Sequence, residues 1–211
     1  MNYNKNYFDK IDSNNKAYFL GFIHADGYIS KSFKEKYNKY YYVFRMRVHE
    51  DDGYILEKLQ EEMKSKIKAK YITLKTNKGN YRQCVFKIAN KHLVERLIDI
   101  YGGDLKDKRL SIPKEVKYNE EYLRHYIRGY FDGDGSISKE EVSISGRYEF
   151  LKDLKSTINL SENITKMKSI HRIRLRSKDS ISWFLNYIYG NLSEKDIFIH
   201  RKRKLADKYL L

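Results

Sequence analysis

The chain is poor in the residues that mark disulfide-stapled, zinc-binding or membrane proteins. Its 211 residues include one cysteine, Cys84, and one proline, Pro113. A single cysteine excludes an internal disulfide framework, which is consistent with a reducing compartment. The sequence has no cluster of cysteine and histidine residues of the kind that binds zinc. No apolar run reaches the roughly 18 residues that span a bilayer. Residues 1–10 are polar, so we expect neither a signal peptide nor a membrane span and predict a cytoplasmic protein.

Acidic residues are scarce relative to basic ones. The chain has 28 Asp and Glu against 43 Lys and Arg, a net charge of +15, and a sequence pI of ≈ 9.6. This excess of positive charge predicts a polyanionic partner, and nucleic acid is the first candidate. An anionic membrane surface is the second candidate, but no apolar span in the sequence supports it. Twenty tyrosines with many Lys, Asn and Ile indicate an AT-rich genome, such as that of a phage or mobile element.

One stretch of sequence occurs twice. Residues 17–30 (AYFLGFIHADGYIS) align with residues 125–138 (HYIRGYFDGDGSIS). Small and acidic residues fall on each other at the same offset: Gly21 on Gly129, Ala25 on Gly133, Asp26 on Asp134, Gly27 on Gly135 and Ser30 on Ser138. The chain is therefore interpreted as two diverged copies of one unit.

Each copy is an apolar, aromatic run that ends in Asp-Gly. Glycine after the last helical residue is a stop signal, so the pattern predicts two helices that end near Asp26 and Asp134. Small residues four apart share a helix face and allow a second backbone to approach closely. We therefore expect the helices to pack on each other through Gly21, Ala25, Gly129 and Gly133, which would bring the two carboxylates together.

Two carboxylates at helix C-termini are electrostatically unfavourable, because a helix C-terminus carries partial negative charge. Divalent cations between Asp26 and Asp134 would offset this cost, and oxygen ligands suit Mg²⁺. Paired metals can activate a water and stabilise the leaving oxygen of a phosphodiester. The alternative is that Asp-Gly forms only a turn in each copy.

The two runs resemble the paired motifs of LAGLIDADG homing endonucleases in their single-chain, two-repeat form. The matching segments are residues 19–27 (FLGFIHADG) and 127–135 (IRGYFDGDG), and the spacing extends the resemblance over nearly the whole chain. It implies Asp26 and Asp134 as catalytic, metal-binding acids for Mg²⁺ or Mn²⁺, with Ala25 and Gly133 in the metal site. The sixth motif position, His24 or Asp132, varies in the family and is given no catalytic role.

Hydrophobic periodicity predicts an α+β fold of two pseudo-symmetric αββαββα repeats, each with one antiparallel sheet. The resemblance implies the same architecture, with the motif helices packed at the centre over two DNA-binding sheets. Predicted domains are an N-terminal repeat at 1–103, a linker at 104–118 and a C-terminal repeat at 119–211. Predicted strands are 28–30, 40–48, 67–76, 80–88, 135–138, 142–145, 164–169 and 171–176. Helices are predicted at 51–64, 90–101, 148–159 and 180–189, besides the two motif helices.

Several predicted strands alternate apolar and basic side chains. A positively charged sheet face on a basic protein favours contact with DNA, and the major groove of DNA admits a β-ribbon. An ordinary solvated face is the alternative. The residues predicted to contact DNA from the strands are Arg45, Arg47, Lys75, Gln83, Lys87, Arg172, Arg174 and Arg176.

Two further basic sets are candidates. The tail at 199–205 predicts phosphate contact through Arg201 and Lys202, with a localisation-type patch or a solvated helix as alternatives. The resemblance also implies a lysine near the third strand of each repeat that assists catalysis. Lys68 and Lys166 are the predicted residues, although each could be an ordinary surface lysine.

Together with these features, the resemblance implies a sequence-specific, metal-dependent endonuclease that cuts double-stranded DNA at a long asymmetric site, in the homing of a mobile intron or free-standing gene. We expect a monomer with internal pseudo-two-fold symmetry and no membrane partner. One alternative is a catalytically inactive binder on the same scaffold, either an intron-splicing maturase that binds intron RNA or a DNA-binding regulator. A nonspecific basic structural protein would not need paired acidic motifs.

Overall fold

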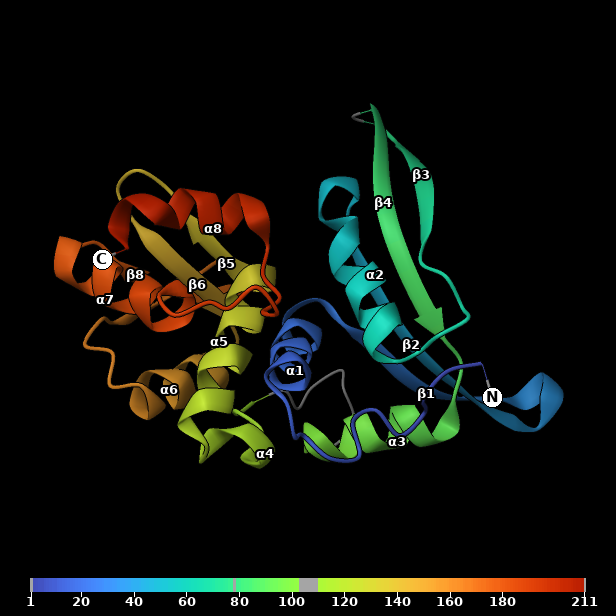
Figure 1. Cartoon of the computed structure of the whole chain (residues 1–211). Helices are drawn as coiled ribbons and strands as arrows, with labels where there is room; N and C mark the ends of the chain where they lie inside the picture. The colour runs from blue at the N-terminus through green and yellow to red at the C-terminus, as the bar shows by residue number, and fades with distance from the viewer. Residues whose placement is uncertain (1, 78, 103–109, 211) are drawn as a thin grey trace. The chain divides into compact units, whose positions relative to one another are not determined.

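The computed structural model describes residues 2–77, 79–102 and 110–210 (Figure 1). By their contacts these residues form two compact units. Unit 1 holds the described residues of Met1–Lys10 and Asp26–Leu105, and unit 2 those of Ile11–Ala25 and Lys106–Leu211. The first motif helix up to Ala25 thus groups with the second half of the chain.

Unit 1 is a four-stranded antiparallel sheet with two helices on one face. The strand order is β1-β2-β4-β3, and helices α2 and α3 pack against β1, β2 and β4. The strands are β1 (Tyr28–Lys34), β2 (Lys39–His49), β3 (Lys70–Thr76) and β4 (Gly79–Ile88). The helices are α2 (Gly53–Glu62) and α3 (Lys91–Ile100), with 3-10 turns at Glu35–Tyr37 and Glu50–Asp52.

Alternation along the strands of unit 1 separates its core from its opposite face. Phe44, Met46 and Val48 of β2 are buried, and in the register they lie opposite Ile88, Phe86 and Cys84 of β4. Because neighbouring strand residues point to opposite faces, Arg45, Arg47 and Lys87 lie on the other side. The predicted in-and-out pattern of these two strands is confirmed.

Unit 2 repeats the strand order and adds the two motif helices. Its antiparallel sheet runs β5-β6-β8-β7. The strands are β5 (Gly135–Ile137), β6 (Val142–Gly146), β7 (Ile164–Met167) and β8 (Ile170–Leu175). The helices are α1 (Asn14–Asp26), α4 (Lys114–Lys117), α5 (Glu120–Asp134), α6 (Tyr148–Thr157), α7 (Lys178–Tyr189) and α8 (His200–Ala206), followed by a 3-10 turn at Asp207–Tyr209.

Local signals explain where the motif helices begin and end. The Ser13 hydroxyl accepts the amide of Lys16 at 3.3 Å, and the Asn119 side chain accepts the amide of Tyr122 at 3.0 Å. Both are N-caps of the kind that satisfy free amides in a first helical turn. Helix α5 ends where Gly135 turns extended and begins β5.

The α+β fold with two αββαββα repeats is confirmed, since each half runs helix, two strands, helix, two strands, helix. Among the described helices, α4 was not predicted, and α8 was foreseen only as an alternative for the tail. Helix α4 lies in the predicted linker 104–118, of which residues 104–109 are outside the described residues, and its Val116 is buried. Asp153 of α6 holds this segment by accepting the Ile112 amide at 2.8 Å and pairing with Lys117 at 2.6 Å. No described helix has the length and apolar character to cross a membrane.

Candidate nucleic-acid interface and active-site acids

Two glycines let the motif helices α1 and α5 approach within backbone contact. A Cβ added at Gly21 would lie 1.8 Å from the carbonyl oxygen of Tyr126, and one at Gly129 would lie 2.0 Å from that of Tyr18. Gly129 and Tyr126 follow Gly21 and Tyr18 at the same offset of the repeat. The crossing is therefore reciprocal, and an internal pseudo-two-fold axis relates the two helices.

The sixth motif positions take part in the same reciprocity. The Tyr18 hydroxyl donates to Asp132 at 2.8 Å, and the Tyr126 hydroxyl bonds to Nδ1 of His24. All four side chains are buried. The sequence reading missed Tyr18 and Tyr126 as partners, although they obey the same offset and precede each motif glycine by three residues. Positions 24 and 132 therefore join the helices to each other.

Asp132 is the centre of a buried polar network in unit 2. Besides Tyr18, the Tyr189 hydroxyl donates to it, and the amide of Ile199 donates at 2.8 Å. Burial raises the pKa of the Asp132 carboxyl from its ordinary value. These bonds attach the segment that leads into α8 to the motif helix.

Arg128 forms a second buried network one turn earlier on α5. Its guanidinium donates to the Ile197 carbonyl at 3.1 Å and to Nδ1 of His125 at 2.6 Å, and it lies 3.4 Å from Asp196. Burial and the Arg128 charge lower the pKa of His125 to about 4. His125 is therefore neutral at pH 7 and accepts from Arg128.

The two candidate metal-binding acids each end a motif helix. Asp26 is the last residue of α1 and is exposed, and Asp134 is the last residue of α5 and is half-buried. Ala25 and Gly133 precede them and are half-buried. The structure does not test whether the two acids meet, so that stays a prediction.

The donor set suits a metal that keeps most of its water. Carboxylate and carbonyl oxygens are the ligands of Mg²⁺, which takes one or two carboxylates and completes its shell with water and substrate phosphate. In the described part of the chain, no group of three or more His, Cys, Asp or Glu side chains could hold a metal alone. A carboxylate such as that of Asp26 or of Asp134 is by its chemistry a suitable ligand for a cation that completes its shell with water and phosphate.

Lys202 does not lie where a phosphate contact would place it. It is 5% exposed, and its ammonium donates to the carbonyls of Phe131, Asp132 and Gly135 at 2.7–2.8 Å and approaches that of Gly133 at 3.4 Å. A lysine that satisfies the last carbonyls of a helix is a C-cap. The predicted DNA contact of Lys202 is corrected accordingly: this lysine holds the backbone on both sides of Asp134. Arg201 is exposed on α8.

The face of the unit 1 sheet opposite its helices carries basic residues without acidic ones. We call it the open face; its described strand residues include Lys34, Lys39, Arg45, Arg47, Lys70 and Lys87 and no Asp or Glu. Gln83 is half-buried on this face. Arg45 lies over the ring of Tyr28, 4.4 Å from its centroid. Among the described residues Arg47 and Lys87 have no ion-pair partner, so their charges are available to a ligand.

The corresponding face of unit 2 has arginines that are already engaged. Arg172 donates to the Ser145 hydroxyl at 3.2 Å. Glu141 lies 3.6 Å from Arg174 and 3.2 Å from Arg176. These three arginines point away from the buried Ile173 and Leu175, as the alternation predicts.

Three predicted lysines lie elsewhere. Lys75 pairs with Asn80, which shares the face of Cys84. The register therefore places Lys75 on the side of the sheet opposite Arg45 and Arg47. Its grouping with those arginines is corrected. Lys166 pairs with His171 on the face of Ile173. Lys68 is exposed just before β3. The structure does not test the catalytic role of Lys68 or Lys166.

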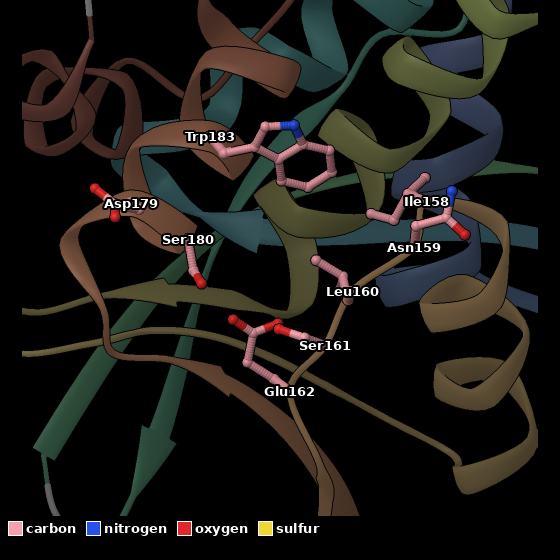
Figure 2. A pocket seen from close by; sticks show the side chains of 8 residues that line it. All are labelled: Ile158, Asn159, Leu160, Ser161, Glu162, Asp179, Ser180 and Trp183. Carbon is pink, nitrogen blue, oxygen red and sulfur yellow. The ribbon is translucent and has the colours of Figure 1, made fainter.

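A hollow of about 520 Å³ in unit 2 holds none of the predicted site residues. Figure 2 shows Trp183 and Ser180 of α7 on one side and the segment from Ile158 to Glu162 on the other. It carries two carboxylates, those of Glu162 and Asp179, and no histidine, lysine or cysteine. We assign it no catalytic role.

Family models match both halves of the chain. A model described as LAGLIDADG endonuclease matches residues 19–118, and one described as LAGLIDADG-like domain matches residues 121–189. Among curated proteins, the chain is similar to "Probable cell division protein WhiA" of Clostridium botulinum. Identity is 31% over 109 residues for strain Hall (48% of this chain) and 37% over 105 residues for strain Eklund 17B (46% of this chain). In each case the match covers 33% of the relative, so the chain spans about a third of the length of these curated relatives.

Solved structures share the fold. I-DmoI in complex with DNA and Ca superposes with a TM-score of 0.63 at 15% identity, covering 91% of this chain and 96% of that chain. I-SmaMI, a LAGLIDADG homing endonuclease bound to cleaved DNA, gives 0.61 at 14% identity, covering 95% and 88%. At this identity the solved structures show the fold alone. Since one family model falls on each motif-bearing half and the two together match most of the chain, the chain belongs to the LAGLIDADG homing endonuclease family, in its two-repeat form.

Proposed function

We propose that this protein is a sequence-specific, metal-dependent endonuclease that makes a double-strand break in DNA at a long asymmetric site. The observation that carries the proposal is that both motif helices end in an aspartate: Asp26 on α1 and Asp134 on α5. Such an enzyme would serve the homing of a mobile intron or a free-standing gene. We propose that it acts as a monomer, because one chain contains both repeats.

In this proposal Asp26 and Asp134, with the carbonyls of Ala25 and Gly133, hold Mg²⁺ or Mn²⁺. When bound, such metals supply an activated water and stabilise the leaving oxygen of a phosphodiester. The contribution of the chain is to present the carboxylates at fixed helix ends, which the glycine crossing and Lys202 support. Related structures solved with Mn agree with a divalent metal.

Duplex binding is supported by the open face of unit 1, whose cations lie on adjacent strands. A two-stranded or wider β-ribbon fits the major groove, and lysine or arginine contacts to phosphate fix its register. The two sheets carry different side chains, so the site that they read should be asymmetric.

Asp26→Asn and Asp134→Asn test the proposal. Each should lower double-strand cleavage by about a hundred- to a thousandfold, the scale on which loss of one main transition-state stabiliser acts, while duplex affinity stays within about threefold. Asp179→Asn is the matched control, because Asp179 is an exposed helical aspartate of α7. Cleavage that persists in both variants would contradict the proposal. Loss of binding in both would show that the acids are structural.

A second function is favoured by the similarity to the WhiA proteins, named as probable cell division proteins. On this alternative the chain binds nucleic acid without cutting it, as a DNA-binding regulator or an intron-splicing maturase. Sequence-specific binding with no cut under any divalent metal would favour it, and intron RNA would be the next ligand to test.

A further inference from the structure

A two-stranded ribbon extends from the sheet of unit 1. Strand β4 pairs with β2 only from Phe44 to His49, whereas β1 pairs with β2 as far as Lys39. The segment from Ser30 to Val43, which we call the aromatic ribbon, therefore has two strands, joined by a 3-10 turn (Figure 1). A two-stranded hairpin buries little of its own surface.

The aromatic ribbon exposes large rings and cations together. Phe33 is 46% exposed, Tyr37 60%, Tyr40 50% and Tyr41 40%. Four lysines accompany them and only one acid: Lys31, Lys34, Lys36, Lys39 and Glu35. Exposed apolar rings clustered on one element mark an interaction surface, and the excess of cations selects an anionic partner.

Two of the rings lie on the face that a duplex on the open face would not cover. Phe33 and Tyr40 are direct cross-strand partners, and their centroids are 5.0 Å apart. They share the face of Phe44 and are opposite Arg45, since the side-chain period of a strand is two. Lys31 lies 5.3 Å from the Tyr40 centroid and is held there by Glu95 of α3 at 3.3 Å.

We infer that the Phe33–Tyr40 face of the aromatic ribbon binds unpaired bases of single-stranded nucleic acid, with Lys31 of the same face and Lys36 of the turn on its phosphates. Paired bases in a duplex are already stacked on each other and offer no free face to a side chain, whereas unpaired bases stack on aromatic rings between basic residues. The inference is independent of cleavage and adds a second nucleic-acid surface to the open face.

The test compares oligonucleotide binding by two double variants of the full chain. A 12-nucleotide single strand containing 2-aminopurine is titrated in EDTA, so that no cleavage contributes, and both anisotropy and base fluorescence are followed. Phe33→Ala with Tyr40→Ala should weaken single-strand binding at least about tenfold, the scale of lost base stacking, and abolish the fluorescence quenching. Duplex binding should change less than about twofold. Arg45→Ala with Arg47→Ala should do the reverse.

Controls separate this result from a general loss of charge or fold. Tyr118 is 86% exposed in unit 2, and Tyr118→Ala should leave both affinities unchanged. Phe33 and Tyr40 are exposed, so their variants should keep the unfolding midpoint of the parent chain. Titrating the same oligonucleotide in RNA and in DNA form identifies the natural ligand. Tighter binding of the RNA indicates a transcript, and tighter binding of the DNA indicates an unwound DNA strand. No binding of either strand by the parent chain, or equal losses of single-strand and duplex affinity in the Phe33 and Tyr40 variant, would overturn the inference.

Discussion

The motif helices α1 and α5 have the same crossing and different surroundings. Each has a glycine against the backbone of the other. Elsewhere the pairs at the repeat offset diverge. Ala17 and Leu20 of α1 are apolar, whereas their counterparts His125 and Arg128 of α5 are polar, and the histidine His24 corresponds to the acid Asp132. The difference teaches that the positions in backbone contact must remain glycine in both helices. The neighbouring positions differ because different segments pack on α1 and on α5. Helix α5 has buried polar side chains because the segment from Asp196 to Lys202 packs on it and forms hydrogen bonds with it.

The two sheets repeat this contrast. Their strand orders correspond, but the strands of unit 1 have 7, 11, 7 and 10 residues and those of unit 2 have 3, 5, 4 and 6. Arg47 of the first sheet has no ion pair among the described residues, and Arg174 and Arg176 of the second share Glu141. The longer sheet thus has the freer charges. If the chain binds duplex DNA as proposed, this sheet should contribute more to the affinity.

The largest effect is expected where the helices differ most. Arg128→Leu gives α5 the residue that α1 has at this position and leaves Asp196 and the Ile197 carbonyl without their buried donor. It should lower the free energy of unfolding by about 4 kcal/mol, as does removal of one member of a buried ion pair. Urea denaturation measures this. A loss below about 1 kcal/mol would show that the network contributes little to stability.

Gly21→Ala and Gly129→Ala should lower the free energy of unfolding by nearly equal amounts, because the crossing is reciprocal. Each places a Cβ within 2.0 Å of a carbonyl oxygen, and the helices must separate, at a cost of about 3 kcal/mol of unfolding free energy. Lys152→Ala, at an exposed position of α6, serves as the control. Thermal unfolding that shows one glycine tolerant and the other not would refute the symmetry of the crossing.

Stability should depend on pH through His125, whose counterpart in α1 is Ala17. Its folded pKa of about 4 lies below the unfolded value of 6.5. The stabilisation is therefore complete above pH 6.5 and is lost as pH falls toward 4, by about 3 kcal/mol. Urea midpoints at several pH values measure this slope. His125→Gln, which keeps an acceptor for Arg128 and cannot be protonated, should flatten the profile in this window; an unchanged profile would assign the slope to other groups.

The smallest effect sharpens the comparison of the sheets. Glu141→Gln should release Arg174 and Arg176 and tighten duplex binding about threefold, since exposed ion pairs are worth under about 1 kcal/mol. Glu140→Gln makes the same charge change at an exposed neighbour. Equal tightening in both variants would mean that only net charge matters and that the arginines were never restrained.

In unit 1, periodicity predicted the order of strands and helices because β2 and β4 each bury one face and α2 and α3 each bury one stripe. Arg47 and Lys87 were placed correctly on that basis, since alternation within one strand needs no tertiary information. Lys75 was misplaced because its face depends on pairing with Asn80 across a hairpin.

Burial of polar groups was beyond sequence reasoning. Lys202 is one of five basic residues in succession in the tail. Nothing in the local sequence distinguishes it as the residue whose ammonium binds the carbonyls at the end of α5. Arg128 and Asp132 each became the centre of a buried network through contacts with residues 57 to 69 positions away. The repeat offset did carry one unused signal, since it pairs Tyr18 with Tyr126.

The most direct test of the account is cleavage of a randomised duplex DNA library by the full chain, with and without Mg²⁺, followed by sequencing of the cut ends. The account predicts metal-dependent double-strand cuts at one long, asymmetric site that disappear in EDTA. Enrichment of bound duplexes without cuts under Mg²⁺ or Mn²⁺ would contradict the endonuclease proposal and leave the chain as a binding protein on this fold.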